Sequence, residues 1–184
     1  MEGKTLYLER STGECRKGDW VEELDLEGVE RIVVGTGPGS FAGIRSALAF
    51  AQGFALGRPG LEVLGMPSAC AIAGEHYRAN PGSGRLTVVG DARQGKLWIA
   101  EFEGLRLLGE VYQIEASALQ LHALTEVVSP DDRRIGALLR EAFGDRYLGE
   151  RAPTADGLRI FAEADPSVLV KEPLPIYLNP AVRS

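Results

Sequence analysis

The residues best suited to chemistry lie in one glycine-rich loop, GTGPGS at positions 35–40, directly after the apolar run 30–34. Closely spaced glycines let several backbone N–H groups converge, and the first turn of a helix adds a partial positive charge. Such a loop can bind a phosphate or another anion. The candidate anion- or nucleotide-binding residues here are Gly37, Pro38, Gly39 and Ser40.

The spacing of this loop departs from each strict motif for phosphate binding or nucleophilic catalysis. A dinucleotide fingerprint requires a third glycine where Ser40 stands, and a P-loop requires a Gly-Lys-Ser or Gly-Lys-Thr that does not follow. A nucleophile elbow requires a glycine at the position of Pro38. A tight strand-to-helix turn also uses glycine without any ligand, and Ser40 is then expected to cap the helix.

Asp91 and Arg93, within GDARQG at 90–95, form a second candidate ligand site. An Asp in this position can equally stabilise a turn by bonding its own backbone. The remaining reactive side chains are isolated, since His76, His122, Cys15 and Cys70 show neither metal-ligand nor redox spacing. We therefore expect no catalytic residue, no metal site and no cofactor, with a nucleotide as the one ligand left to consider.

Alternating strands and helices are expected to position these residues. Apolar runs at 30–34 and 61–64 each precede a helical segment, the first at 41–56 and the second beginning at Pro67 or Ser68. This pattern predicts an α/β fold.

The second half of the chain has clear boundary signals between its expected elements. The linker signal NPGSG at 80–84 predicts two lobes, 1–84 and 85–184, and the segment 85–104 is typical of a β-hairpin. An amphipathic helix is predicted over 131–144 and a weaker one over 154–166. An irregular proline-rich tail follows.

The helix at 41–56 is the most distinctive element because it is apolar on nearly all sides. Four small residues recur every four positions and form one row: Gly43, Ala47, Ala51 and Ala55. Bulkier side chains flank that row: Phe41, Ile44, Leu48 and Phe54. Such a helix must be covered on more than one side, so either a second internal helix or a partner protein covers the face opposite its sheet. These eight residues are the candidate partner-binding surface.

Composition excludes several classes of protein. The 184 residues are 45% hydrophobic and 25% charged, with a net charge of −6, which is opposite to the basic surface of an independent nucleic-acid binder. Neither a membrane-spanning run nor a signal peptide is evident, so we expect a cytoplasmic protein.

The segment IVVGTGPGSFAGIRSALAFAQGFA at 32–55 closely resembles the TsaB family, also called YeaZ. Three more segments resemble that family in the expected order: VLGMPSACAIA at 63–73, VVGDARQGKLWIAEF at 88–102 and PLPIYLNPAV at 173–182. An ordered set of four matches is far more specific than one glycine loop.

The resemblance implies an actin-like (ASKHA) fold of two related lobes. It implies a non-catalytic scaffold or activator of tRNA threonylcarbamoyladenosine synthesis that binds a TsaD-like catalytic protein directly, here through helix 41–56. A TsaE-like ATPase would join the complex, tRNA would be reached only through it, and the chain alone would form a homodimer. The alternatives are a small ATP-binding or sugar-kinase-like enzyme of the same fold and, remotely, a peptidase.

The segment before the glycine loop is shorter than the resemblance implies, so the N-terminal lobe is expected to be abbreviated. LYLERSTGE at 6–14 is similar to the first strand and turn of the family, with Glu9 and Arg10 where an Asp and a Thr usually stand. Either that strand is retained or it is lost. In both cases the phosphate cradle would be incomplete.

Overall fold

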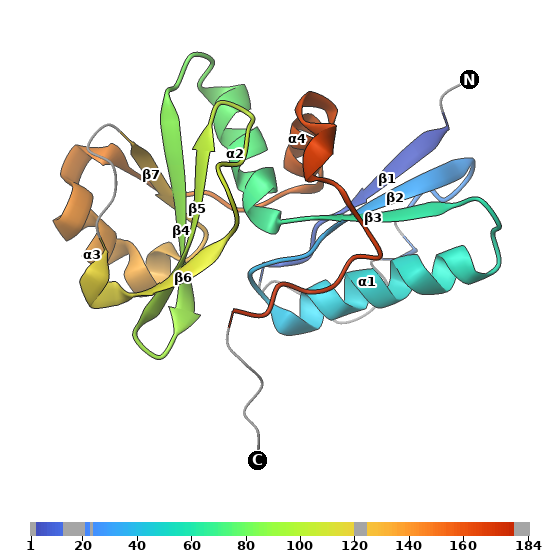
Figure 1. The fold of residues 1–184 in the computed structure, drawn as a ribbon, viewed down its shortest axis with the longest axis horizontal. Coiled ribbons are helices and arrows are strands. Elements are labelled where there is room, and N and C mark those ends of the chain that lie inside the picture. Colours follow the sequence, from blue (N-terminus) through green and yellow to red (C-terminus); the bar gives the residue numbers. More distant parts are fainter. Residues whose placement is uncertain (1–2, 13–20, 23, 120–124, 179–184) are drawn as a thin grey trace.

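The strands form two sheets, with helices packed between them and against their outer faces (Figure 1). The structure is a computed structural model that describes residues 3–12, 21–22, 24–119 and 125–178. Cys15 and His122 lie outside these described residues.

The first sheet has the strand order β1-β2-β3-β9. Its members are β1 (Lys4–Leu8), β2 (Val29–Gly35), β3 (Glu62–Met66) and β9 (Val170–Lys171). The first three are parallel and β9 is antiparallel to β3. Helix α1 (Phe41–Leu56) follows β2 and α2 (Ser68–Ala79) follows β3, which confirms the two predicted βα units. The first strand of the family, which the sequence left as either retained or lost, is present as β1.

The second sheet has the order β6-β5-β4-β7-β8. Its members are β4 (Arg85–Arg93), β5 (Lys96–Glu103), β6 (Tyr112–Glu115), β7 (Glu126–Ser129) and β8 (Tyr147–Glu150). The antiparallel pair β4 and β5 confirms the predicted hairpin. Helix α3 (Asp132–Phe143) ends at Gly144, whose φ of 55° suits glycine. Helix α4 (Ala155–Ala164) is capped by Thr154, and short 3₁₀ turns occupy Ala116–Ala118, Gly144–Arg146 and Pro166–Val168.

Alternating side chains on β5 pack into two separate hydrophobic cores. On β5, Leu97 and Ile99 face the core beneath α3, whereas Trp98, Ala100 and Phe102 face the central core around α2 and α4. The pleat of a strand sends successive side chains to opposite faces, so both faces of this strand are buried. A third core lies between α1 and the first sheet. Figure 1 shows α1 beneath the first sheet, α2 and α4 between the sheets and α3 on the far side of the second sheet.

Helices α2 and α4 approach each other unusually closely in the central layer. A Cβ added at Gly74 of α2 would lie 2.3 Å from the Gly157 carbonyl oxygen, and one at Gly157 would lie 2.1 Å from the Ala71 carbonyl oxygen. Since both obstacles are backbone atoms, only glycine permits this crossing. The contact joins the helix that follows β3 to the helix that follows β8.

The boundary predicted near residue 84 separates the two sheets in the sequence, because β1 to β3 precede it and β4 to β8 follow it. After β8 the chain returns to the first sheet. Helix α4 packs on β1, and β9 joins the first sheet beside β3, so the segment from about residue 155 onward lies with the first sheet rather than the second.

Among the described residues, no helix is both long and apolar enough to cross a lipid bilayer.

Candidate functional site

Helix α1 divides into an inner and an outer face. Gly43, Ala47 and Ala51 are buried against the first sheet, with Ile44 and Leu48 beside them in the same core. Their burial contradicts the assignment of these five residues to a partner-binding surface, because a partner cannot reach them. The small row lets the helix lie close to its own sheet. Of the predicted set, Phe41 is exposed, and Phe54 and Ala55 are half-buried.

The outer face of α1 has a small row of its own that the sequence reading missed. Its members are exposed and spaced at four, three and four positions: Ala42, Ser46, Ala49 and Gly53. Residues at this spacing share one helix face. A signal for the correct assignment was present, since the large aliphatic residues Ile44 and Leu48 border the inner row rather than this one.

Large apolar side chains are exposed at both ends of this helix. Phe41 is 54% exposed at the first turn and Leu56 is 90% exposed at the last. The tail after β9 extends the apolar surface, because the Tyr177 ring lies 5.7 Å from the Phe41 ring and is itself 58% exposed. The Ile176 N–H donates to the Thr36 carbonyl at 2.9 Å, which fixes the tail beside the glycine loop. The outer face of α1 and the adjoining tail thus form an exposed apolar surface.

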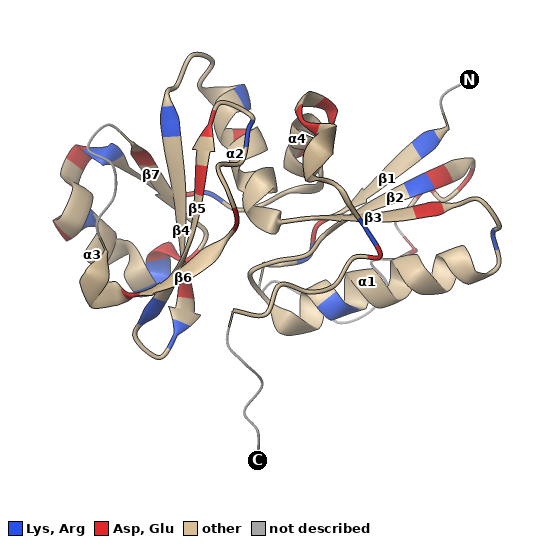
Figure 2. Cartoon of the chain, viewed as in Figure 1, with Lys and Arg blue, Asp and Glu red and all other residues tan. Residues whose placement is uncertain are grey.

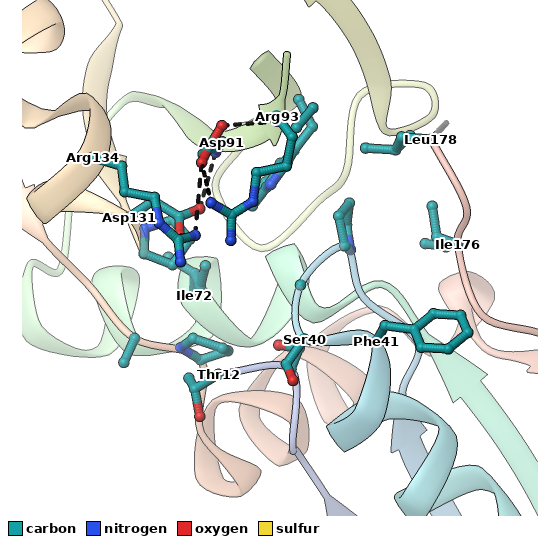
Figure 3. A pocket seen from close by; sticks show the side chains of 18 of the residues that line it. Thr12, Ser40, Phe41, Ile72, Asp91, Arg93, Asp131, Arg134, Ile176 and Leu178 are labelled. Atoms are coloured by element: carbon teal, nitrogen blue, oxygen red, sulfur yellow. Dashed lines mark hydrogen bonds and ion pairs between the residues drawn. The ribbon is translucent and has the colours of Figure 1, made fainter. Parts of the chain in front are cut away.

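A cavity of about 700 Å³ lies between the glycine loop and the second sheet. Five of the six predicted anion-binding residues line it: Pro38, Gly39, Ser40, Asp91 and Arg93. Figure 3 shows Asp91 and Arg93 gathered with Asp131 and Arg134, with Ser40 and Thr12 across the cavity. The fold therefore brings both candidate sites together, although they are about fifty residues apart in the chain.

Four charged groups of this cavity form ion pairs with one another. Asp91 Oδ2 lies 3.3 Å from Arg93 Nη1 and 3.7 Å from Arg134 Nη1, while Asp131 Oδ1 lies 3.4 Å from Arg134 Nη1. Asp91 Oδ1 also accepts the Arg93 N–H at 2.8 Å, which is the turn-stabilising bond considered as the alternative to ligand binding. These two carboxylates and two guanidinium groups cancel locally, and Glu150 adds a further carboxylate to the lining, so the cavity offers an anion no excess positive charge.

The N-terminus of α1 is partly satisfied by the chain itself. The Ser40 N–H donates to the Ser11 carbonyl at 2.6 Å, and the Ser40 hydroxyl accepts the Gly43 N–H at 3.4 Å, which confirms its role as the helix cap. A Cβ at Gly39 would lie 2.3 Å from the Ser11 carbonyl oxygen. That carbonyl therefore lies directly before the first turn of the helix. The Gly37 N–H is also bonded, to the Ser68 hydroxyl at 3.0 Å.

Glu9 lies behind the glycine loop, at the position where the family usually has an Asp. Its Oε1 accepts the Ser11 N–H at 2.6 Å, and a Cβ at Gly35 would collide with its carboxylate. Burial raises the pKa of this carboxyl group above its usual value. Glu9 thus supports the turn from below and is absent from the cavity lining.

The other reactive side chains are part of the core. His76 is 0% exposed and its Nε2 lies 2.9 Å from Glu126 Oε2. Cys70 is buried on α2, and burial raises the pKa of its thiol. Within the described ranges, no three His, Cys, Asp or Glu side chains are placed to hold a metal ion.

Comparison with known proteins gives consistent matches. The family model described as TsaD, tRNA N6-adenosine threonylcarbamoyltransferase, matches residues 21–140. The Escherichia coli tRNA threonylcarbamoyladenosine biosynthesis protein TsaB is 36% identical over 78 residues, which are 42% of this chain and 33% of that protein. An uncharacterized protein of Mycobacterium tuberculosis is 33% identical over 118 residues, 62% of this chain and 52% of that protein. The matched regions thus span a third to about half of these relatives.

Two solved structures share the fold. YeaZ from Pseudomonas aeruginosa superposes with a TM-score of 0.69 at 23% identity, over 95% of this chain and 99% of that one. A second protein of that organism, described as similar to peptidase YEAZ, gives a TM-score of 0.63 at 24% identity, over 86% of this chain and 78% of that one. The two-sheet architecture is therefore that of the YeaZ structures.

Proposed function

Because the chain belongs to the TsaD-type family, in its TsaB (YeaZ) branch with the actin-like (ASKHA) fold, we propose that it is a non-catalytic subunit of tRNA threonylcarbamoyladenosine synthesis. Its role is to bind a TsaD-like catalytic protein and support that protein's activity. The exposed outer face of α1 is the surface that makes this contact.

One observation carries the proposal: α1 has a single charged residue, Arg45, and its own sheet covers only one of its two faces. The outer row of Ala42, Ser46, Ala49 and Gly53 has no large side chain, so the axis of a second helix can come unusually near. Phe41 and Leu56 protrude at the two ends of that row and can fill gaps beside a partner helix. A soluble protein rarely leaves a contiguous apolar surface of this kind without a binding role.

The side chains around the cavity favour a supporting role over catalysis. Ser40 is committed to capping α1, and Asp91 is bonded to the backbone and guanidinium of Arg93. His76, the histidine within the residues that the structure describes, is buried against Glu126 and does not line the cavity. A general base or nucleophile needs a free reactive atom within reach of its substrate. Ser40 and Asp91 line the cavity but are engaged within the chain, and His76 does not line it.

The rest of the complex follows from the family. We propose that a TsaE-like ATPase joins the pair, that tRNA is held by the complex rather than by this acidic chain, and that the site of action is the cytoplasm. The net charge of −6 supports an indirect contact with tRNA, because phosphate binding requires an excess of Lys and Arg.

The proposal is tested by co-purification with the TsaD-like protein encoded in the same genome. Ala49→Arg places a long cation at the centre of the outer face and should abolish co-purification while circular dichroism stays unchanged. Ala137→Arg, at an exposed position on α3, is the matched control and should co-purify like the wild type. Undiminished binding of Ala49→Arg would exclude α1 as the interface. Ala51→Arg does not serve this purpose, because Ala51 is 0% exposed.

A second candidate function is nucleotide binding in the cavity. One observation favours it: the fold gathers Pro38, Gly39, Ser40, Asp91 and Arg93 around a single space of about 700 Å³. The paired charges and the Ser11 carbonyl oppose it. Titration calorimetry with ATP or ADP and magnesium decides the matter, and we expect no micromolar binding.

A further inference from the structure

Two arginines at the edges of the outer face of α1 have no acidic partner among the residues that the structure describes. Arg45 lies on the first half of the helix and Arg58 lies two residues beyond its end, and both are exposed. Neither guanidinium has a carboxylate within ion-pair distance among the described residues. Figure 2 shows the rest of α1 as an uncharged helix. Lys4, Arg31, Arg85 and Arg140, by contrast, are exposed cations that do have acidic partners.

An aromatic ring of the same helix holds each of these arginines. The Arg45 guanidinium carbon lies 4.9 Å from the centre of the Phe41 ring, and that of Arg58 lies 3.6 Å from the centre of the Phe54 ring. Arg58 Nη1 also donates to the Phe54 carbonyl at 3.0 Å. Stacking restrains a guanidinium but leaves in-plane N–H groups free to donate to a carboxylate. Both cations are thus held in place for an acidic partner that the described chain does not supply.

The positions of the two cations define the partner they fit. They are thirteen residues apart in the sequence, which corresponds to about 20 Å along a helix axis. The surface between them is small and apolar, with Ser46 and Gln52 its polar residues. A complementary helix would therefore be apolar in the middle and acidic near both ends.

A second copy of the chain is a poor occupant of this surface. Residues 41–56 contain no Asp or Glu, so pairing two α1 helices brings together four guanidinium groups and no carboxylate from either helix. Like charges at an interface cost affinity and suppress the wrong partner. The homodimer expected from the family resemblance would need a different face or a compensating anion.

We propose that the outer face of α1 binds an apolar helix of the TsaD-like partner that carries two carboxylates about 20 Å apart, one paired with Arg45 and one with Arg58. This inference rests on the proposed function and adds the chemistry that selects a heterologous partner over self-association. The two ion pairs fix the register of the helices, and the small apolar row provides the close contact.

The test compares two variants that change the net charge equally. Arg45→Glu/Arg58→Glu reverses both proposed contacts, and Arg106→Glu/Arg133→Glu reverses two exposed cations of the second sheet and α3. Binding of each to the TsaD-like protein is measured by calorimetry at about 50 and 500 mM salt. The first variant should bind about ten- to thirtyfold more weakly at low salt, with a smaller dependence on salt than the wild type. The control should match the wild type.

Each other outcome overturns the inference in a distinguishable way. If the wild-type chain fails to bind, the proposed function fails and the acidic contacts fail with it. If the wild type binds and Arg45→Glu/Arg58→Glu binds equally well, the two ion pairs alone are refuted. Equal weakening by the control would assign the effect to net charge. If the reversal instead changes self-association in sedimentation velocity and leaves partner binding intact, the occupant is a second copy.

Discussion

Helices α1 and α2 follow strands β2 and β3, which are parallel neighbours, yet the two helices occupy different surroundings. Both are rich in small apolar residues and poor in charge. Helix α2 lies between the two sheets and is buried from Ser68 to Tyr77, while α1 is covered by its sheet on one face and exposed on the other. Helix α4 meets α2 across Gly74 and Gly157, and no described element plays that part for α1.

The difference shows what an apolar helix sequence can and cannot specify. A helix that is apolar on all sides must be covered on every side, because exposed apolar surface is unfavourable. They do not indicate whether the covering element belongs to the same chain. For α2 the chain itself supplies the cover, and for α1 we propose that a partner does.

The largest effect is expected at the inner face of α1. Ala51→Arg should prevent folding, because Ala51 is 0% exposed between α1 and the first sheet and an unpaired buried cation has a high desolvation cost. The measurement is the circular dichroism spectrum and the soluble yield. Ala49→Arg, two residues earlier on the outer face, should stay within about 0.5 kcal/mol of the wild type. A folded Ala51→Arg variant would contradict the assignment of the two faces.

A smaller but still large effect on stability is expected at the contact between α2 and α4. Gly157→Ala should lower the free energy of unfolding by about 3 kcal/mol or more, since the added methyl group would overlap the Ala71 backbone. Denaturant unfolding measures the change. Wild-type stability in this variant would mean that α2 and α4 do not cross at these glycines.

A moderate pH effect is expected from the histidine inside α2. Burial lowers the pKa of His76 below its usual 6.5, although the Glu126 carboxylate opposes this. The unfolded chain therefore binds a proton more readily than the folded protein, so this contribution to stability is present above pH 6.5 and is lost as the pH falls below it. Denaturant midpoints at pH 7.5 and 5.5 should differ less in His76→Gln than in the wild type. An unchanged difference would show that His76 does not titrate in this way.

The smallest effect on stability is expected on the outer face of α1, where the substitution should stabilise the protein rather than destabilise it. Gly53→Ala should raise the free energy of unfolding by about 0.5 to 1 kcal/mol, because a Cβ there meets no atom within 4 Å and alanine is the better helix former. The same denaturant assay applies. Destabilisation would show that this face is covered by a part of the chain outside the described residues.

Local patterns predicted the elements of this fold well, because each depends on neighbours in the sequence. The predicted hairpin is present as β4 and β5, and Ser40 and Gly144 marked helix ends correctly. Two small rows on α1 have nearly the same spacing, so the spacing alone did not decide which one faces the sheet, and only the flanking Ile44 and Leu48 distinguish them. The chosen row was the buried one.

Features that depend on distant segments were beyond local reasoning. The Asp91 backbone N–H bonds to Asp131, forty residues away, and the Ser11 carbonyl reaches the N-terminus of α1 from the other side of the glycine loop. These contacts engage backbone groups beside the glycine loop, and they oppose the anion binding that the loop suggests. The Gly74 and Gly157 crossing likewise joins segments about eighty residues apart.

The central claim, that the outer face of α1 binds a TsaD-like protein, is tested most directly by hydrogen exchange with and without that protein. Peptides covering 41–58 should become protected on binding, while peptides covering 68–79 should exchange at the same rate in both states, because α2 is already covered. Protection confined to 68–79 or to the second sheet, with 41–58 unchanged, would contradict the account.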